Sequence, residues 1–461
     1  MHPLVRQVSV SSVTVPGGRK VPFAALVSAA ATIASTLLGG GGAVVPIETA
    51  VRQTGWLLSP LLFLLGGAWT IYTSWLLIRS SLLSNEPSYE TLAARTLGAT
   101  GARTVQVLIV VNAFFLGVSV QGLFVSLVAV QMPYSTVVIL GALPLLYIVP
   151  FMRQIDQLAP ISYVTAITAV TFVGFVVGRV IGGPDINPVL LAPLPVDLPP
   201  REKGLPASTV WLECFATAVI AFVVQFNVLP LLRTFPEAQA ERSMMQALLM
   251  GIGLPTTIYL TLELLSYRTF GDASYDLIID HYELAPFGPY MLGLLGLGQL
   301  LSYALLAHAG VTEVGKLCLL IARCVGVQGA QLHGHEKTDL LSQKPAPVYG
   351  TMAGEDGALP KSGGLQADEA GSVALFVADA VAGVLWVVMT TAAAVVLTDV
   401  GSLLALVGAV CAMPLMTIFP PLMYARCPGA EDDPLKPLHI AMSLFGVVAT
   451  AACIWISISA F

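Results

Sequence analysis

The chain has 461 residues, of which 56% are hydrophobic and only 10% are charged. Soluble domains carry roughly 25% charged residues, and a single soluble core stops growing beyond about 250–300 residues. The composition therefore excludes an ordinary soluble protein and favours one polytopic membrane domain. The formal net charge of −6 gives no sign of a basic patch, so no nucleic-acid partner is expected.

Runs without Asp, Glu, Lys or Arg locate the membrane spans, because crossing about 30 Å of hydrocarbon takes roughly 20 apolar residues. Ten such runs occur, namely Val21–Ile47, Gln53–Ile78, Thr104–Met152, Gln157–Gly178, Cys214–Leu232, Ser243–Leu262, Leu284–Thr312, Ala380–Thr398, Val400–Ala425 and Pro437–Phe461. The third run is long enough for two spans joined by a tight turn near Gln131–Pro133. An all-α membrane protein with eleven transmembrane helices is predicted.

The placement of Lys and Arg predicts the orientation. With the N-terminus in the cytoplasm, sixteen of these residues lie on the cytoplasmic side and five on the other side. Positive residues concentrate in cytoplasmic loops, so the N-terminus is predicted inside and the C-terminus outside. This divides the chain into a cytoplasmic segment (1–20), helices 1–8 (21–325), a flexible cytoplasmic linker (326–372) and helices 9–11 (373–461).

Cysteines and ionisable groups give little sign of chemistry in the spans. The six cysteines are scattered without metal-type spacing, so neither a disulfide framework nor a metal site is predicted. No nucleophile–base pair or metal-ligand cluster appears in the spans, which disfavours an enzyme. No cofactor is expected.

The first span contains an interruption signal. Four consecutive glycines, Gly39, Gly40, Gly41 and Gly42, follow Ser35 and Thr36 and precede Pro46. Each glycine in a helix costs about 1 kcal/mol relative to alanine, so the run is predicted to unwind and to expose N–H groups that suit a carboxylate. The alternative is a close helix–helix contact through small residues.

The sixth span contains a second signal. Gln225 and Asn227 place two amides, with Phe226 between them, in the middle of the span, and Pro230 removes one helix hydrogen bond just after them. A neighbouring helix that satisfies both amides is the alternative. Interrupted helices at matching positions of two halves point to a transporter site, and spans 1 and 6 begin two five-span halves.

The residues resemble the amino acid/auxin permease family, nearest to its branch of sodium-coupled neutral amino acid transporters and vacuolar amino acid transporters. The likeness runs from about Pro22 to Phe461 apart from the linker, and its motifs are Gly39–Pro46, Ser88–Leu92 with Leu97–Gly98, Gln225–Pro230, Arg242–Met244 through Tyr267–Asp272, and Gly401–Gly408 with Pro420. The resemblance implies a five-plus-five inverted repeat with interrupted helices 1 and 6. It also implies amino acid transport by alternating access.

The coupling ion is open between proton and sodium. Gln225 stands where the branch usually has a histidine, and His308-Ala309-Gly310-Val311-Thr312 stands where sodium-coupled relatives carry Pro-x-Arg. Ser35 and Ser302 keep a hydroxyl at the positions that align with sodium-binding residues. His308 is a candidate proton relay or a neutral packing residue. Proton coupling is favoured.

The sequence therefore predicts a secondary active amino acid transporter. The substrate is expected to meet Ser35, Thr36 and Gly39–Gly42 on span 1 and Gln225–Asn227 on span 6. The alternative is a membrane amino acid sensor with the same fold, although Gly326–Ser372 shows no amphipathic stretch for a signalling partner. A monomer is expected, in the plasma membrane or in a vacuolar or lysosomal membrane.

Overall fold

The structure, a computed structural model, describes residues 21–39, 47–129, 132–151, 158–182, 210–270, 282, 285, 287–324, 365–397, 404, 406–431 and 433–460. Within these ranges every regular element is a helix and no strand occurs. The described part of the chain is therefore all-α, as the composition predicted.

The helices follow one another along the whole chain. In order they are α1 (Phe23–Gly39), α2 (Ile47–Ser84), α3 (Tyr89–Ala129), α4 (Tyr134–Phe151), α5 (Ala159–Gly182), α6 (Val210–Ala221), α7 (Gln225–Leu232), η4 (Glu237–Gln239), α8 (Ala240–Phe270), α9 (Gly288–Cys324), α10 (Leu365–Val396), η7 (Gly408–Ala412), η8 (Pro414–Ile418), α12 (Phe419–Ala425) and α13 (Lys436–Ala460).

Eleven membrane segments result from these helices. Seven helical stretches of the described residues are long and apolar enough to cross a membrane alone. Four shorter apolar stretches supply the others: Phe23–Gly39, Tyr134–Leu146, Ala218–Leu232 and Ala380–Val396. The prediction of eleven spans is confirmed, and the long third run does divide into two helices, α3 and α4.

Some boundaries differ from the predicted ones. α3 begins at Tyr89, inside the loop expected before span 3, where the Ser88 hydroxyl accepts the N–H of Thr91 at 3.3 Å and caps the helix. The left-handed backbone of Gly98 (φ 78°) then kinks α3. α10 begins at Leu365, inside the segment predicted as linker.

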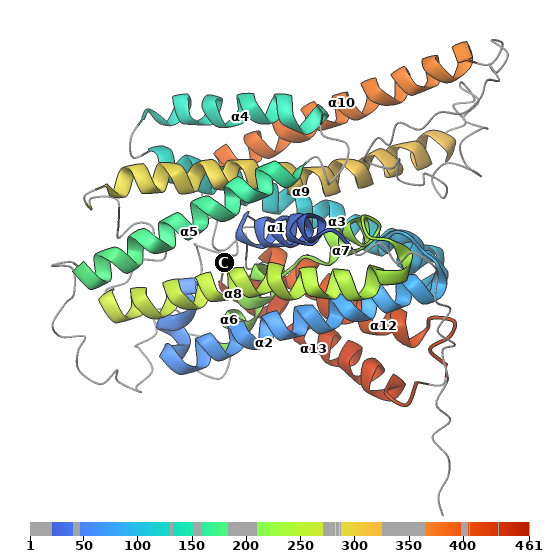
Figure 1. Ribbon diagram of the computed structural model, residues 1–461, viewed down its shortest axis with the longest axis horizontal. Coiled ribbons are helices and arrows are strands. Elements are labelled where there is room, and N and C mark those ends of the chain that lie inside the picture. The colour runs from blue at the N-terminus through green and yellow to red at the C-terminus, as the bar shows by residue number, and fades with distance from the viewer. Residues whose placement is uncertain are drawn as a thin grey trace, which may run out of the picture.

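Corresponding helices of the two halves pack against each other. α2 contacts α8, α3 contacts α9, and α4 contacts α10, so the second, third and fourth span of each half meet their counterparts. α1 lies in the middle of the bundle, in contact with α5, α8 and α9 (Figure 1). This packing agrees with a two-fold relation between the halves, and the inverted direction of the repeat stays a prediction.

The predicted interruption of the sixth span coincides with helix ends, and that of the first span stays a prediction. The described part of α1 extends to Gly39, and Gly40, Gly41, Gly42 and Pro46 lie outside the described residues. The segment after the glycine run enters α2, which continues from Ile47 to Ser84. In the sixth span α6 ends at Ala221 and α7 starts at Gln225, with three non-α residues between them. Pro230 lies inside α7, so the break precedes the amides and does not occur at the proline.

The tenth span is wound unusually. η7 and η8 are two consecutive π-helical turns, separated by Met413 and followed by α12. Both turns are largely buried and contact α13, and η7 also contacts α3 and α6. A π turn holds one residue more than an α turn and often marks a functional site.

A polar corner joins α12 to α13. The hydroxyl of Tyr424 donates to Asp433 Oδ2 at 2.8 Å, and the N–H of Leu435 donates to Asp433 Oδ1 at 2.8 Å. The Leu435 N–H holds the pKa of the Asp433 carboxyl below its usual value, and nearby His439 acts in the same direction. Asp433 thus remains an acceptor that fixes the entry of the last helix.

The orientation can be tested at two exposed positions. Cysteines introduced at Met132, between α3 and α4, and at Glu237, in η4, are expected to react with a membrane-impermeant maleimide from opposite sides. In sealed cells only the Met132→Cys protein should be labelled, and both should be labelled after permeabilisation. The unmodified chain is the control, because it reports any labelling of the natural cysteines, of which Cys214, Cys411, Cys427 and Cys453 are buried. Labelling of both variants in sealed cells would contradict the predicted topology.

Candidate functional site

Side chains from two other helices donate hydrogen bonds to carbonyl oxygens in the last described turn of α1. The last carbonyls of a helix have no partner within it, and unpaired polar groups are costly in a membrane. The hydroxyl of Tyr259 on α8 donates to the carbonyl oxygen of Leu37 at 2.8 Å. The amide of Gln299 on α9 donates to the carbonyl oxygen of Leu38 at 3.0 Å. These bonds hold the last described turn of α1 to α8 and α9.

The break between α6 and α7 is held mainly by α2. The hydroxyl of Thr70 donates to the carbonyl oxygen of Phe222 at 3.1 Å. Gln225 accepts the N–H of Val224 at 3.0 Å through Oε1 and donates to the hydroxyl of Thr73 at 3.2 Å through Nε2. Gln225 therefore does not point freely into a cavity; its amide satisfies the break itself and ties it to α2.

Hydrogen bonds from two side chains join the regions of the two predicted interruptions. The amide of Asn227 on α7 donates to the hydroxyl of Thr36 on α1 at 3.0 Å. Tyr259 reaches both helix ends, because its hydroxyl lies 2.8 Å from Leu37 O and 3.5 Å from Ala221 O. The structure thus brings the predicted site residues Thr36, Gln225 and Asn227 into one buried region between spans 1 and 6.

Ser302 on α9 lies directly against the end of α1. A Cβ atom built on Gly39 would lie 1.7 Å from Ser302 Oγ and 2.0 Å from Ser302 Cβ, closer than any real contact. Only glycine therefore allows this approach of the two backbones. The hydroxyl of Ser302 donates to the carbonyl oxygen of Gln299 at 2.7 Å. The lone pairs of the Ser302 oxygen take no part in that bond.

Two buried oxygen atoms near the end of α1 have no hydrogen-bond partner among the described residues. They are Ser35 Oγ, one turn before Gly39, and Gln299 Oε1, on the residue that binds Leu38. Both side chains are almost completely buried. Neutral oxygens that lack donors suit a cation or an ammonium group, because either supplies positive charge without needing an acceptor.

The other predicted site residues are placed differently. Phe226 is buried in α7 beside the two amides. His308 is half-buried on α9, nearly two turns beyond Ser302 towards the C-terminal end of the helix. Gly40, Gly41 and Gly42 lie outside the described residues, so their contact with a carboxylate stays a prediction.

Sequence reasoning missed the residues that hold the breaks together. Tyr259, Thr70, Thr73 and Gln299 all lie in charge-free runs, and their hydrogen bonds reach residues far away in the sequence. One signal was available, since polar side chains three residues apart recur on one face of a helix at Thr70 with Thr73 and at Gln299 with Ser302. Such pairs in an apolar span mark the face turned to the protein interior.

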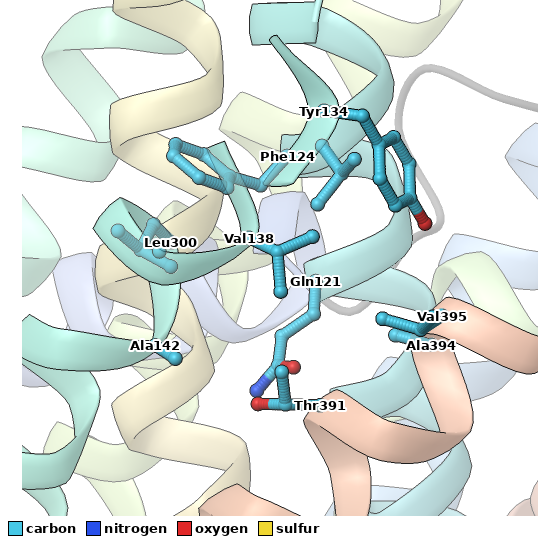
Figure 2. Close-up of a pocket in the computed structure, with 11 residues that line it drawn as sticks. Gln121, Phe124, Tyr134, Val138, Ala142, Leu300, Thr391, Ala394 and Val395 are labelled. Atoms are coloured by element: carbon cyan, nitrogen blue, oxygen red, sulfur yellow. The ribbon is translucent and has the colours of Figure 1, made fainter. Parts of the chain in front are cut away.

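A pocket lies elsewhere, between α3, α4, α9 and α10 (Figure 2). Its lining is mostly apolar and includes Phe124, Val138 and Leu300, with the amide of Gln121 on one side. That amide donates to the hydroxyl of Thr390 at 3.2 Å, so it already serves to join α3 to α10. None of the predicted substrate residues lines this pocket.

Comparison with known families gives a match over nearly the whole chain. A family model described as transmembrane amino acid transporter protein matches residues 24–460. That range includes every helix of the bundle from α1 to α13 and both interruptions. Among proteins with curated functions, none matches the chain.

Solved structures show the same fold at low identity. The chain resembles a manganese transporter from Eremococcus coleocola in complex with an aromatic bis-isothiourea substituted compound, with 10% identity, 97% of this chain and 90% of that chain covered, and a TM-score of 0.51. A histidine-to-alanine mutant of that transporter gives 11% identity, 97% and 88% coverage, and a TM-score of 0.50. At this identity the likeness concerns the fold alone.

Proposed function

The chain belongs to the transmembrane amino acid transporter family, and on that premise we propose that it carries amino acids across a membrane by alternating access. Family and helices together make it an integral, multi-pass membrane transporter. The observation that carries the finer proposal is the pair of interrupted spans, whose ends meet inside the bundle and are bridged by Tyr259 and by the bond from Asn227 to Thr36.

The chemistry of the two ends matches an amino acid zwitterion. The substrate carboxylate would meet the N–H groups of Gly40–Gly42, because exposed backbone N–H groups suit an anion. The ammonium group would meet carbonyl oxygens at the ends of α1 and α6, together with the unpaired Ser35 hydroxyl. Asn227 and Phe226 would bound the side of the site that faces the sixth span.

Alternating access requires the two interrupted spans to move relative to the helices that hold them. The clamping bonds come from α2, α8 and α9, whose donors Thr70, Tyr259 and Gln299 are single side chains that can exchange partners. A break held by side chains can rearrange at lower cost than an intact helix, because no backbone ladder must open. This is the physical basis on which we place the moving parts at the breaks.

Protons are the proposed coupling ion, with sodium as the alternative. The purified protein in liposomes is expected to accumulate a radiolabelled amino acid when only an inward pH gradient is imposed, without sodium. His308→Ala should weaken the pH dependence several-fold. The measurement is initial uptake from a panel of amino acids under separate proton and sodium gradients, with protein-free liposomes as the control.

The opposite result is equally clear. If accumulation needs sodium at every pH, and if Ser302→Ala abolishes that need, the oxygens of Ser35 and Ser302 form a sodium site and the proton proposal is wrong. If the protein binds amino acids and moves none of them under any gradient, the alternative of a membrane sensor takes the place of transport. Whether the membrane is the plasma membrane or a vacuolar or lysosomal one is decided by localising the tagged chain.

A further inference from the structure

Glu263 on α8 is a carboxyl group in the interior of a membrane helix. Its side chain is only 1% exposed, and neither carboxyl oxygen meets a partner with hydrogen-bonding geometry among the described residues. Its polar neighbour is the hydroxyl of Ser59 on α2. Nothing in the substrate site described above uses this acid, which lies one helical turn beyond Tyr259 towards the outer side.

The surroundings of Glu263 offer no described counter-charge. On α6 the neighbouring titratable group is Cys214, whose thiol lies 3.8 Å from Ser59 Oγ. On α8 itself it is Tyr259, which is engaged with the helix breaks. The described residues of α1 include no titratable side chain, and Arg179, in the last turn of α5, interacts with another group. No described cation contacts the acid.

Burial without a counter-charge determines the state of the acid. An ionised carboxylate away from water and from cations is strongly unfavourable, whereas the neutral acid is tolerated. In the conformation seen here Glu263 is therefore protonated. The charged form becomes accessible only when water reaches the seam between α2, α6 and α8.

The contact region between α2, α6 and α8 extends from Glu263 to the hydrogen bonds at the helix breaks. Ser59 and Phe63 lie one turn apart on α2, opposite Glu263 and Tyr259 on α8, and the rings of Phe63 and Tyr259 are 6.2 Å apart. Phe222, the first residue of the break in the sixth span, makes edge-to-face contacts with both rings, at centroid distances of 6.2 and 5.5 Å. The acid thus lies on the outer side of an aromatic cluster that covers the helix breaks.

We propose that Glu263 is a proton-binding site whose protonation is required for the outer half of the bundle to close over the substrate. Water in an open outer seam ionises the acid, and a proton taken up from the outer solution neutralises it before α2, α6 and α8 close. The proposal rests on the transport function proposed above. It assigns to α8 a role that is separate from that of His308, which lies towards the cytoplasmic side.

The test is the dependence of uptake on external pH, measured in liposomes with the full-length protein. For the unmodified protein, uptake should fall about tenfold per pH unit above the midpoint of the single proton that closure requires. Glu263→Gln, which is permanently neutral, should lose this steep fall and keep only the shallower dependence that the proton gradient and His308 contribute. Glu263→Asp should keep a pH dependence with a shifted midpoint.

Two further variants make the test robust. Glu263→Met fills a similar volume without titrating, and it should also lose the steep fall if the glutamine variant folds poorly. Glu237→Gln, at an exposed position of η4, is the matched control and should keep the profile of the unmodified protein. A Glu263→Gln or Glu263→Met protein with the unmodified pH profile would overturn the proposal.

Exchange of labelled for unlabelled amino acid at equal pH separates this inference from the function on which it rests. If the unmodified protein shows no exchange with any amino acid, the transport proposal fails. If exchange is present and the neutral variants keep the steep fall of uptake with external pH, only the role of Glu263 fails. If exchange is present and the neutral variants lose the steep fall, both proposals are supported.

Discussion

Gly39→Ala is expected to abolish transport. The added methyl group would lie 1.7 Å from Ser302 Oγ and 2.0 Å from Ser302 Cβ, so α1 and α9 must separate. Overpacking of this kind typically costs about 1–3 kcal/mol, and more where a backbone must move. The shift would also displace Leu38 from the amide of Gln299, which now lies 3.0 Å from its carbonyl oxygen. Uptake into liposomes and thermal stability in detergent measure the two consequences.

A second substitution tests whether this contact is the cause. Combining Gly39→Ala with Ser302→Gly removes both clashing atoms and leaves Ser302 Cα, at 3.4 Å from the new methyl group, as the nearest atom of that residue. The double variant should regain much of the lost stability and the exchange of amino acids, whereas Ser302→Gly alone should be stable. A double variant as unstable as Gly39→Ala would show that the glycine is needed for another reason.

Tyr259→Phe is expected to reduce uptake by at least tenfold. The hydroxyl bridges Leu37 O and Ala221 O at the two helix ends, and its removal leaves buried carbonyl oxygens without a donor. A buried polar group without a partner costs about 1–3 kcal/mol, and about 1.4 kcal/mol corresponds to a factor of ten in an equilibrium. Initial uptake rate and substrate affinity, measured by scintillation proximity, report on the loss.

Tyr303→Phe is the matched control for that variant. Tyr303 is equally buried, but its hydroxyl bonds to Thr390 at 2.6 Å and joins α9 to α10 rather than the two breaks. Its loss should lower the melting temperature to a similar extent while affecting uptake much less. Equal losses of uptake in the two variants would mean that the position of Tyr259 at the breaks has no special importance.

Much of the fold could be predicted from local features of the sequence. The spans follow from the absence of charge over about 20 residues, a property of each segment alone. The unwinding predicted at the glycine run after Gly39 rests on an equally local property, namely the low helix propensity of glycine. The turn between α3 and α4 likewise follows from the length of one apolar run.

The break in the sixth span could be predicted only in part. Its cause looked local, because Pro230 lacks an N–H, but the proline is accommodated within α7. The residues without α-helical structure are Phe222–Val224, where the carbonyl of Phe222 is bound by Thr70, 152 positions away. The position of the break thus depends on side chains of α2, and a pattern within the span contains no information about them.

The sequence indicated which residues to consider for the candidate site, but it did not indicate how their side chains are hydrogen-bonded. Thr36 and Asn227 were expected to lie near the substrate, and the structure joins them by one hydrogen bond. Gln225 was expected to face the substrate, yet both its amide atoms are bonded, to Val224 and Thr73. Burial of Glu263 between three helices could not be read from its position near the end of a charge-free run.

The two π turns of the tenth span have a consequence for how that helix can move. Each turn contains a residue in excess of the α-helical repeat, and successive α-helical residues are about 100° apart around the axis. If the excess residue migrates one turn along the chain, the stretch it passes rotates by about 100° about the axis while the helix stays hydrogen-bonded. Gly408–Ala412 can therefore turn a new face towards α6, and no loop has to form in the hydrocarbon.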